Sequence, residues 1–173
     1  MRRSLVWPVI GLVVLSDIIT KWIAVLELQP RGVPHPVFGE VVRLTLVYNR
    51  GAAFGLSIGG DYSRWIFLAL TLGALIILWQ LYRATHPGDV VRALAIALVS
   101  GGAIGNLIDR VRSAQGVVDF IDIGIGDMRW PTFNVADIAV STGAVLLAWV
   151  LWTEDRAERA RPAAVSAEVS ETS

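Results

Sequence analysis

The sequence predicts an integral membrane protein that is mainly α-helical, with four antiparallel transmembrane helices and a small β-rich segment outside the membrane. Composition supports this fold class, because 54% of the 173 residues are hydrophobic and 17% are charged, against about 25% charged residues in an ordinary soluble domain. Four apolar stretches also approach the roughly 20 residues that a transmembrane helix needs. Between the first two stretches, a long segment rich in β-branched residues and glycine predicts strands and turns.

The four spans belong to a single membrane domain, residues 1–152, and lie at about residues 5–26, 65–82, 93–110 and 133–152. Arg2 and Arg3 precede the first span, as basic residues do in a secretory signal peptide. The apolar run is longer than the usual signal-peptide core of about 7–15 residues and no small-residue cleavage pattern follows, so we interpret it as an uncleaved span. Residues 153–173 are expected to form a cytoplasmic tail that begins as a helical extension and ends disordered.

An even number of spans places both termini on one side of the membrane, and cytoplasmic loops carry an excess of Lys and Arg. The arginine numbers of the two sides tie, but the terminal-side segments are shorter, so their higher density of arginine favours an N-in, C-in orientation. The tryptophans agree with this arrangement, since amphipathic rings prefer the two membrane interfaces. The expected inner belt is Trp7, Trp79, Trp149 and Trp152, and the expected outer belt is Trp22, Trp65 and Trp130.

Two external segments connect the spans. Residues 27–64 form the longer one, in which residues 40–48 alternate side chains in the pattern of a strand with one buried face. Several glycines follow and predict turns. Residues 111–132 form the second external loop, which has further strand-like sequence around residues 117–123.

Composition also excludes several kinds of site. The chain has no cysteine, which excludes disulfides, thiolate nucleophiles and cysteine-ligated metal sites. His35 and His86 lie in different predicted loops without the spacing of a metal-ligand pair, and we expect both to be solvated. We therefore expect no metal and no cofactor. The formal net charge is zero, which gives no indication of nucleic acid binding.

Polar residues of three spans are predicted to lie at one depth. Ionisable side chains within membrane spans are costly and mark functional sites. Because a helix rises about 1.5 Å per residue, depth can be counted along each span, and the count places the polar residues in the outer third of the bilayer. These residues are Asp17, Lys21, Asn106, Asp109, Arg110, Asn134 and Asp137. The shared depth predicts a common site near the outer face.

Some of these residues also have structural interpretations. Asp17 and Lys21 are four residues apart and share a helix face, so they either neutralise each other or also brace the site. Asp109 either forms a salt bridge with an arginine at the interface or belongs to the site. Gly101 and Gly105 are typical of close helix packing rather than of chemistry.

Asp137 is the carboxylate that the apolar context makes most unusual. A second carboxylate beside it would share a proton and could activate water, as in aspartic proteases. Asp119 and Asp122 in the preceding loop are both candidates, and spacing alone does not choose between them. A serine–lysine dyad with Lys21 is disfavoured because no serine carries a nucleophile motif. Residues 124–127, Gly-Ile-Gly-Asp, match a motif of presenilin-type intramembrane proteases, but their loop position predicts a β-turn.

The chain resembles the bacterial lipoprotein signal peptidases (signal peptidase II). Five sequence motifs, in the same order as in the family, carry the resemblance. Each motif alone is short, but the five together are highly specific. They are Asp17-Ile-Ile-Thr20-Lys21, Asn49-Arg50-Gly51-Ala52-Ala53-Phe54-Gly55, Gly102-Ala-Ile-Gly105-Asn106-Leu-Ile-Asp109-Arg110, Val118-Asp119-Phe120 and Phe133-Asn134-Val135-Ala136-Asp137. We see no departure at a motif position.

The resemblance implies an aspartic endopeptidase with catalytic Asp119 and Asp137, which distinguishes Asp119 from Asp122. It implies supporting or substrate-binding roles for Asp17, Lys21, Asn49, Gly51, Asn106, Asp109, Arg110 and Asn134. The family's substrate is a diacylglyceryl-modified prolipoprotein, which is cut just before the lipidated cysteine. The implied location is the bacterial cytoplasmic (inner) membrane, with the β-rich segment as a periplasmic cradle.

The expected partners are therefore prolipoprotein substrates and membrane lipid, and a monomer suffices because one four-span bundle carries all the motifs. Two functions of other classes remain open. One is an ion-coupled transporter with a relay of Asp17, Lys21, Asp109 and Asp137, although the inverted repeat typical of transporters is missing. The other is a non-catalytic scaffold that uses the cradle for binding.

Overall fold

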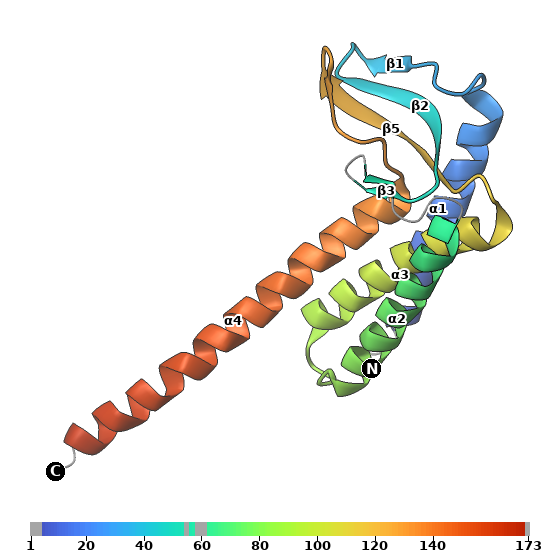
Figure 1. Ribbon diagram of the computed structural model, residues 1–173. Coiled ribbons are helices and arrows are strands. Elements are labelled where there is room, and N and C mark those ends of the chain that lie inside the picture. Colours follow the sequence, from blue (N-terminus) through green and yellow to red (C-terminus); the bar gives the residue numbers. More distant parts are fainter. Residues whose placement is uncertain (1–4, 54–55, 58–61, 172–173) are drawn as a thin grey trace.

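The computed structural model describes residues 5–53, 56–57 and 62–171. Four long helices run alternately up and down, and a small sheet covers one end of the bundle (Figure 1). The helices are α1 (Val6–Glu27), α2 (Ser63–Ala84), α3 (Val90–Arg112) and α4 (Val135–Glu171). We call the end at which α1 and α3 finish and α2 and α4 begin the sheet end.

Four helical segments of the described chain are long and apolar enough to cross a membrane, with mean hydropathy between 1.7 and 2.1. Large apolar side chains such as Leu12, Ile77 and Val145 are exposed on the helix surfaces. A helix that is apolar on all sides is typical of a membrane span rather than of a surface helix in water. The predicted four-span, mainly α-helical fold is therefore confirmed.

The fourth helix differs from the expectation at both of its ends. It begins at Val135 rather than at Phe133, because the Phe133 carbonyl accepts hydrogen bonds from the backbone N–H groups of Phe120 and Ile121 at 3.0 and 2.8 Å. Phe133 is thus tied to a strand. At the other end the helix continues to Glu171, which corrects the expectation that the tail ends disordered. Alanine, glutamate and arginine are strong helix formers and are frequent there.

Helix α3 is the centre of the bundle and contacts each of the other three helices (Figure 1). Its glycines permit these contacts. A Cβ atom at Gly101 would lie 2.9 Å from Val13 Cβ, and one at Gly105 would lie 2.5 Å from Asp17 Oδ2, both on α1. The predicted close packing at Gly101 and Gly105 is therefore confirmed, and it brings Asp17 directly against α3.

The main sheet is antiparallel and has the strand order β1-β2-β5-β6. A separate two-stranded sheet contains β3 and β4. The bounds are β1 (His35–Phe38), β2 (Val42–Asn49), β3 (Ala52–Ala53), β4 (Leu56–Ser57), β5 (Val117–Ile125) and β6 (Met128–Arg129).

Strand β2 confirms the strand that the sequence predicts at residues 40–48, and β5 confirms the strand-like sequence of the second external loop. The sheet joins both external segments, because β2 pairs directly with β5. One expectation is wrong: His35 begins strand β1 and is half-buried, rather than lying solvated in a loop. The turn expected at residues 124–127 is shorter, because residues 124 and 125 pair with β6 as the end of β5, and Gly126, at φ +56°, and Asp127 make the reversal.

A small apolar core fixes the sheet to the end of α1. Its buried members come from α1 and its C-terminal boundary, from β2 and from β5: Ala24, Leu28, Leu46, Val118 and Phe120. Burial of large apolar side chains stabilises such contacts by about 1.5–3 kcal/mol per residue. The core therefore holds β5 against the helical bundle, with Asp119 between two of its members.

Candidate active site

Asn134 connects the two candidate carboxylates. It is fully buried, and its side-chain Nδ2 lies 2.7 Å from Asp119 Oδ1, 3.1 Å from Asn106 Oδ1 and 3.2 Å from the Val118 carbonyl oxygen. Its other side-chain atom, Oδ1, accepts a hydrogen bond from the Asp137 backbone N–H at 3.0 Å. An amide group has two N–H donors, so the three acceptors share them. The side-chain N–H group of Asn134 therefore bonds to the Asp119 carboxylate, and its side-chain oxygen bonds to the backbone N–H of Asp137.

Asn134 and Asp137 also form the start of α4. The backbone N–H of Asn134 donates to Asp137 Oδ2 at 3.2 Å, and the reverse bond joins the Asp137 N–H to Asn134 Oδ1. This reciprocal pattern is a capping box, which satisfies backbone donors that the first turn of a helix leaves unpaired. The same two side chains thus begin the helix and position the carboxylate.

Asn106 provides a second contact to Asp137. Its Oδ1 accepts from Lys21 Nζ at 3.0 Å, and its Nδ2 donates to Asp137 Oδ1 at 2.8 Å. An ammonium group has donors but no acceptor, so Lys21 fixes which way the Asn106 amide is turned. Asp137 consequently receives one N–H donor on each of its carboxylate oxygens.

Asp119 lies in β5 and is 2% exposed. The side chains of Asn49 and Asn134 both hydrogen-bond to it. Burial, together with repulsion from the Asp137 carboxylate, raises the pKa of Asp119 from 3.8 to about 7, although the two amide hydrogen bonds act in the opposite direction. A carboxyl group with a pKa near neutrality can hold or release a proton under physiological conditions.

Asp122 has a different environment from Asp119. Three residues apart on a strand, the two side chains point to opposite faces of the sheet. Asp122 forms ion pairs with Arg43 at 2.9 Å and with Arg129 at 2.8 Å. Burial opposes ionisation of Asp122, but hydrogen bonds from Arg129, Arg43 and Thr45 outweigh it and hold its pKa below the usual value. Asp122 therefore clamps β2, β5 and β6 together and stays ionised.

Lys21 lies between two further carboxylates. Its Nζ is 2.7 Å from Asp17 Oδ2 and 2.8 Å from Asp109 Oδ2. Asp17 also accepts from the Ala136 backbone N–H at 2.9 Å, and Asp109 accepts from the Val118 N–H at 3.2 Å. This cluster links α1, α3, α4 and β5. The Asp17–Lys21 pair predicted from spacing is present, whereas Asp109 pairs with Lys21 and with no arginine of the described residues.

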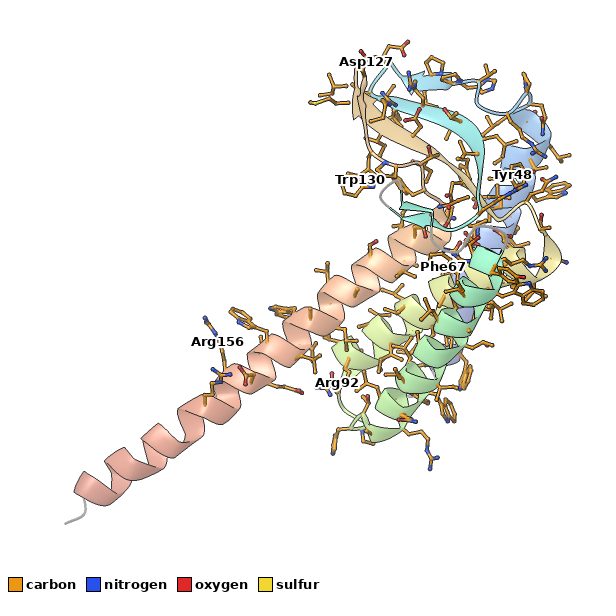
Figure 2. The ribbon with its side chains drawn as sticks, viewed as in Figure 1. Tyr48, Phe67, Arg92, Asp127, Trp130 and Arg156 are labelled. Atoms are coloured by element: carbon orange, nitrogen blue, oxygen red, sulfur yellow. The ribbon has the colours of Figure 1, made fainter. Side chains whose placement is uncertain are left out.

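Arg110 and Gly51 lie beside these residues. One guanidinium nitrogen of Arg110, Nη1, donates to the Asn106 carbonyl at 3.3 Å, and the guanidinium carbon lies 5.4 Å from the centroid of the Phe67 ring. The backbone N–H of Gly51 donates to Asn49 Oδ1 at 2.9 Å. Gly51 has φ +112°, and a Cβ atom there would collide with the Phe67 ring. Phe67, at the sheet end of α2 (Figure 2), therefore supports both residues.

Asp137 faces a cavity of about 310 Å³. Trp130 and Phe133 line it from the connection between β6 and α4, and Ile138 and Thr142 line it from α4. Figure 2 shows Trp130 between the sheet and the start of α4. Asp137 therefore borders the space beside α4, while Asp119 is more deeply buried.

Three supporting residues carry no clear signal in the sequence analysis. Gly116 has φ +104°, and a Cβ atom there would overlap the Asn49 carbonyl. It lies four residues beyond Arg112, the end of α3, so the sequence marks only a turn there. Arg64 donates to the carbonyls of Arg110 at 2.5 Å and Val111 at 2.8 Å, and these partners are too distant in sequence to be found by spacing. Phe67 is one apolar residue within an apolar helix.

The described residues include no group of three or more His, Asp or Glu side chains arranged to hold a metal ion. Their polar groups instead bond to one another, in a connected set of carboxylates, amides and one ammonium group. Two of its carboxylates, Asp119 and Asp137, share Asn134 as a neighbour and differ in burial. Such a pair can share one proton, because two adjacent carboxylates do not readily ionise together.

Comparisons with known proteins agree on one family. A model of the family described as signal peptidase (SPase) II matches residues 9–153. The lipoprotein signal peptidase of Burkholderia mallei (strain SAVP1) is 44% identical over 137 residues, which cover 79% of this chain and 80% of that protein. The lipoprotein signal peptidase of Polynucleobacter necessarius subsp. necessarius (strain STIR1) is 41% identical over 140 residues, covering 80% and 83%.

Solved structures are similar as well. Two are described as bacterial membrane enzymes determined by the in meso method. One has a TM-score of 0.74 and 30% identity, and the match covers 88% of this chain and 90% of the other. The second has a TM-score of 0.71 and 31% identity, with coverage of 86% and 92%.

Proposed function

The chain belongs to the signal peptidase II family, and we propose that it is a membrane aspartic endopeptidase that cleaves diacylglyceryl-modified prolipoproteins just before the lipidated cysteine. The family match covers most of the chain, and the similar curated proteins are lipoprotein signal peptidases. The observation that carries the catalytic part is the pair of carboxylates, Asp119 and Asp137, that meet at Asn134. The other polar residues of the site orient these two groups.

In the proposed mechanism the two carboxyl groups share one proton and hold a water molecule between them. The ionised group takes a proton from the water as its oxygen attacks the carbonyl carbon of the scissile bond. The protonated group donates its proton to the carbonyl oxygen, which gives a neutral tetrahedral intermediate. When the C–N bond breaks, the group that took the proton from water passes it to the departing amine nitrogen. One hydroxyl of the intermediate becomes the new carbonyl oxygen and returns its proton to the other carboxylate, so the pair again carries one proton.

We assign the resting proton to Asp119 and the negative charge to Asp137. Asp119 is the more buried of the two side chains, and burial disfavours the charged form. Asp137 lies in the first turn of α4, where the helix dipole and unpaired N–H groups favour negative charge. Asp137 would then be the base towards water, and Asp119 the acid towards the carbonyl.

The proposed location is the bacterial inner membrane, with both termini in the cytoplasm and the sheet end at the outer face. A site at the sheet end would lie at headgroup depth, because α2 and α4 begin there and α1 and α3 end there. The acyl chains of a lipidated substrate could remain in the membrane while its peptide approaches Asp137 through the cavity lined by Trp130 and Phe133. All of these residues belong to one chain, so a monomer suffices.

The deciding experiment is cleavage of a synthetic diacylglyceryl lipobox peptide by purified protein. Asp119→Asn and Asp137→Asn should each abolish cleavage, while the protein remains inserted and abundant. Asp127→Asn is the matched control, because Asp127 is an exposed aspartate in the turn after β5, and this variant should cleave normally. Near-normal turnover in either of the first two variants would refute the two-aspartate mechanism.

A further inference from the structure

A second cavity at the sheet end has a cationic lining, of which Asn49 and Arg110 also belong to the candidate active site. It measures about 250 Å³ and lies among the end of β2, the first turn of α2 and the last turn of α3. Arg50, Arg64 and Arg110 line it together with polar Asn49 and Ser63. No carboxylate of the described residues lines this cavity, so its wall contains three arginines and no acidic side chain.

Arg64 is held in place by neutral groups. Its Nε and Nη2 donate to the carbonyls of Arg110 and Val111, the terminal turn of α3, and its guanidinium carbon lies 5.1 Å from the centroid of the Trp65 ring. Carbonyl oxygens position a guanidinium but do not cancel its charge. The structure therefore keeps the Arg64 guanidinium ordered and charged at the cavity.

Arg50 is the least engaged of the three arginines. Its backbone carbonyl accepts from Ser63 Oγ at 2.7 Å, which anchors the segment after β2 to α2. Its side chain is exposed, and within the described residues its guanidinium has no hydrogen bond or ion pair. A charged, unpaired group at a membrane boundary is available for an anion.

The position of the cavity indicates which anion would reach it. The first turn of α2 and the last turn of α3 are the ends of two apolar spans, which is the depth of lipid headgroups. Trp65 is 58% exposed beside it, as is typical of the aromatic belt at a membrane interface. Guanidinium groups bind phosphate oxygens in a paired, bidentate geometry, and phosphate is the anionic group of lipid headgroups at this depth.

We propose that this cavity binds the phosphodiester group of an anionic phospholipid from the surrounding membrane. The bound headgroup would bridge the segment after β2 to α2 and α3. It would contact Arg50 and Arg64 as primary cationic partners, with the Ser63 hydroxyl as a further hydrogen-bonding group. This cavity shares no lining residue with the cavity at Asp137, and lipid binding in it would not require peptide cleavage.

The test is native mass spectrometry of the purified full chain, titrated with phosphatidylglycerol or with phosphatidylcholine of the same acyl chains. We expect one phosphatidylglycerol to bind in preference to phosphatidylcholine. A basic residue near a membrane surface contributes about 1 kcal/mol to attraction of anionic lipid, so Arg50→Gln should weaken binding about fivefold and Arg50→Gln with Arg64→Gln about 25-fold. Arg112→Gln is the matched control, because Arg112 is exposed at the same end but does not line the cavity.

Three results would overturn the proposal. Equal affinity for the two lipids would remove the role of the anionic headgroup. A loss in Arg112→Gln as large as in Arg50→Gln would indicate diffuse surface attraction rather than a site. Competition by inorganic phosphate at the same concentration as lipid would indicate a free-anion site. If the double variant does not fold, Arg50→Gln alone decides, because no described residue accepts a hydrogen bond from the Arg50 guanidinium.

Discussion

Asn134 has two tasks that a single amide rarely combines. It caps α4 through the reciprocal bonds with Asp137, and its Nδ2 reaches Asp119 at 2.7 Å. The cap fixes where the helix begins, and the helix start fixes where Asp137 points. The Nδ2 bond then sets the position of Asp119 relative to that start. The relative position of the Asp119 and Asp137 carboxylates therefore depends on the Asn134 side chain.

Replacement of Asn134 by alanine should consequently affect catalysis more than stability. Loss of an N-cap costs about 0.5–2 kcal/mol, and we expect a destabilisation of that size. Cleavage should fall at least about 100-fold, because both carboxylates lose a positioning contact. Cleavage rates and thermal unfolding of the detergent-solubilised protein measure the two effects.

The control for this variant is Asp89→Ala. Asp89 caps α3 at the opposite end of the bundle by accepting from the Arg92 backbone N–H at 3.0 Å, so its loss costs similar stability far from the carboxylates. We expect near-normal cleavage from it. Equal activity losses in the two variants would show that Asn134 acts only through helix stability.

The raised pKa of Asp119 predicts a pH limit on activity. If Asp119 holds the shared proton, cleavage should decline as pH rises through about 7, the pKa of that carboxyl group, because the pair then loses its acid. The profile of kcat/KM over about pH 5 to 9 measures this. A rate that stays flat to pH 9 would assign the acid to a different group.

The same pKa predicts how stability depends on pH. The folded protein binds the Asp119 proton up to about pH 7, whereas the unfolded chain releases it near pH 3.8. The contribution of Asp119 to stability is therefore full below the unfolded pKa and is lost as pH rises through the folded pKa. The unfolding temperature of the wild type should fall between those limits relative to Asp119→Asn, which cannot titrate. Parallel curves for the two proteins would contradict this.

Among the elements, β5 carries one of the two proposed catalytic carboxylates and the ion-paired Asp122. It carries Asp119 on one face and Asp122 on the other, and its start and end are both marked by glycines with positive φ. At the start, Gly116 lies where a Cβ atom would overlap the Asn49 carbonyl, but at the end Gly126 faces open space. Gly116 and Gly126 both have a positive φ, but only Gly116 is packed against another part of the chain.

Gly116→Ala and Gly126→Ala should therefore behave differently. A non-glycine residue at positive φ costs about 1–3 kcal/mol, and both variants should lose some stability. Only Gly116→Ala also displaces Asn49 and the strand that leads to Asp119, so it should lose cleavage at least about tenfold more than Gly126→Ala, through misplacement of reacting groups. Cleavage normalised to folded protein makes the comparison. Similar activities would show that the contact with Asn49 is unimportant.

Helices were predictable from sequence where burial in lipid dictates composition, and the strand at residues 40–48 was predictable from alternation. The connection between β2 and β5 was not, because Arg43 and Asp122 lie 79 residues apart and strand pairing depends on tertiary contacts. For the same reason spacing left Asp119 and Asp122 equivalent. Their difference arises from which sheet face each occupies and from the arginines that reach only Asp122.

At the scale of the whole molecule, the polar residues that helix rise predicts at one depth form a connected hydrogen-bond network. Hydrogen bonds connect three helices through Asn106 on α3, which bonds to Lys21 on α1 and to Asp137 on α4. Depth counting could place these residues at one level because helix geometry is uniform. It could not show that Lys21 bonds Asp109 as well as Asp17, since that depends on how α1 and α3 are rotated about their axes.

The orientation of the whole chain gives the last prediction, and the absence of cysteine from the sequence makes it directly testable. Asp127, in the turn at the far edge of the sheet (Figure 2), and Gly88, in the turn between α2 and α3, are exposed at opposite ends of the bundle. With both termini in the cytoplasm, a membrane-impermeant maleimide should label Asp127→Cys in cells whose outer membrane has been permeabilised. It should label Gly88→Cys only after the inner membrane is also broken. Labelling of Gly88→Cys with an intact inner membrane would invert the chain and place Asp119 and Asp137 at the cytoplasmic face, where an exported prolipoprotein could not reach them.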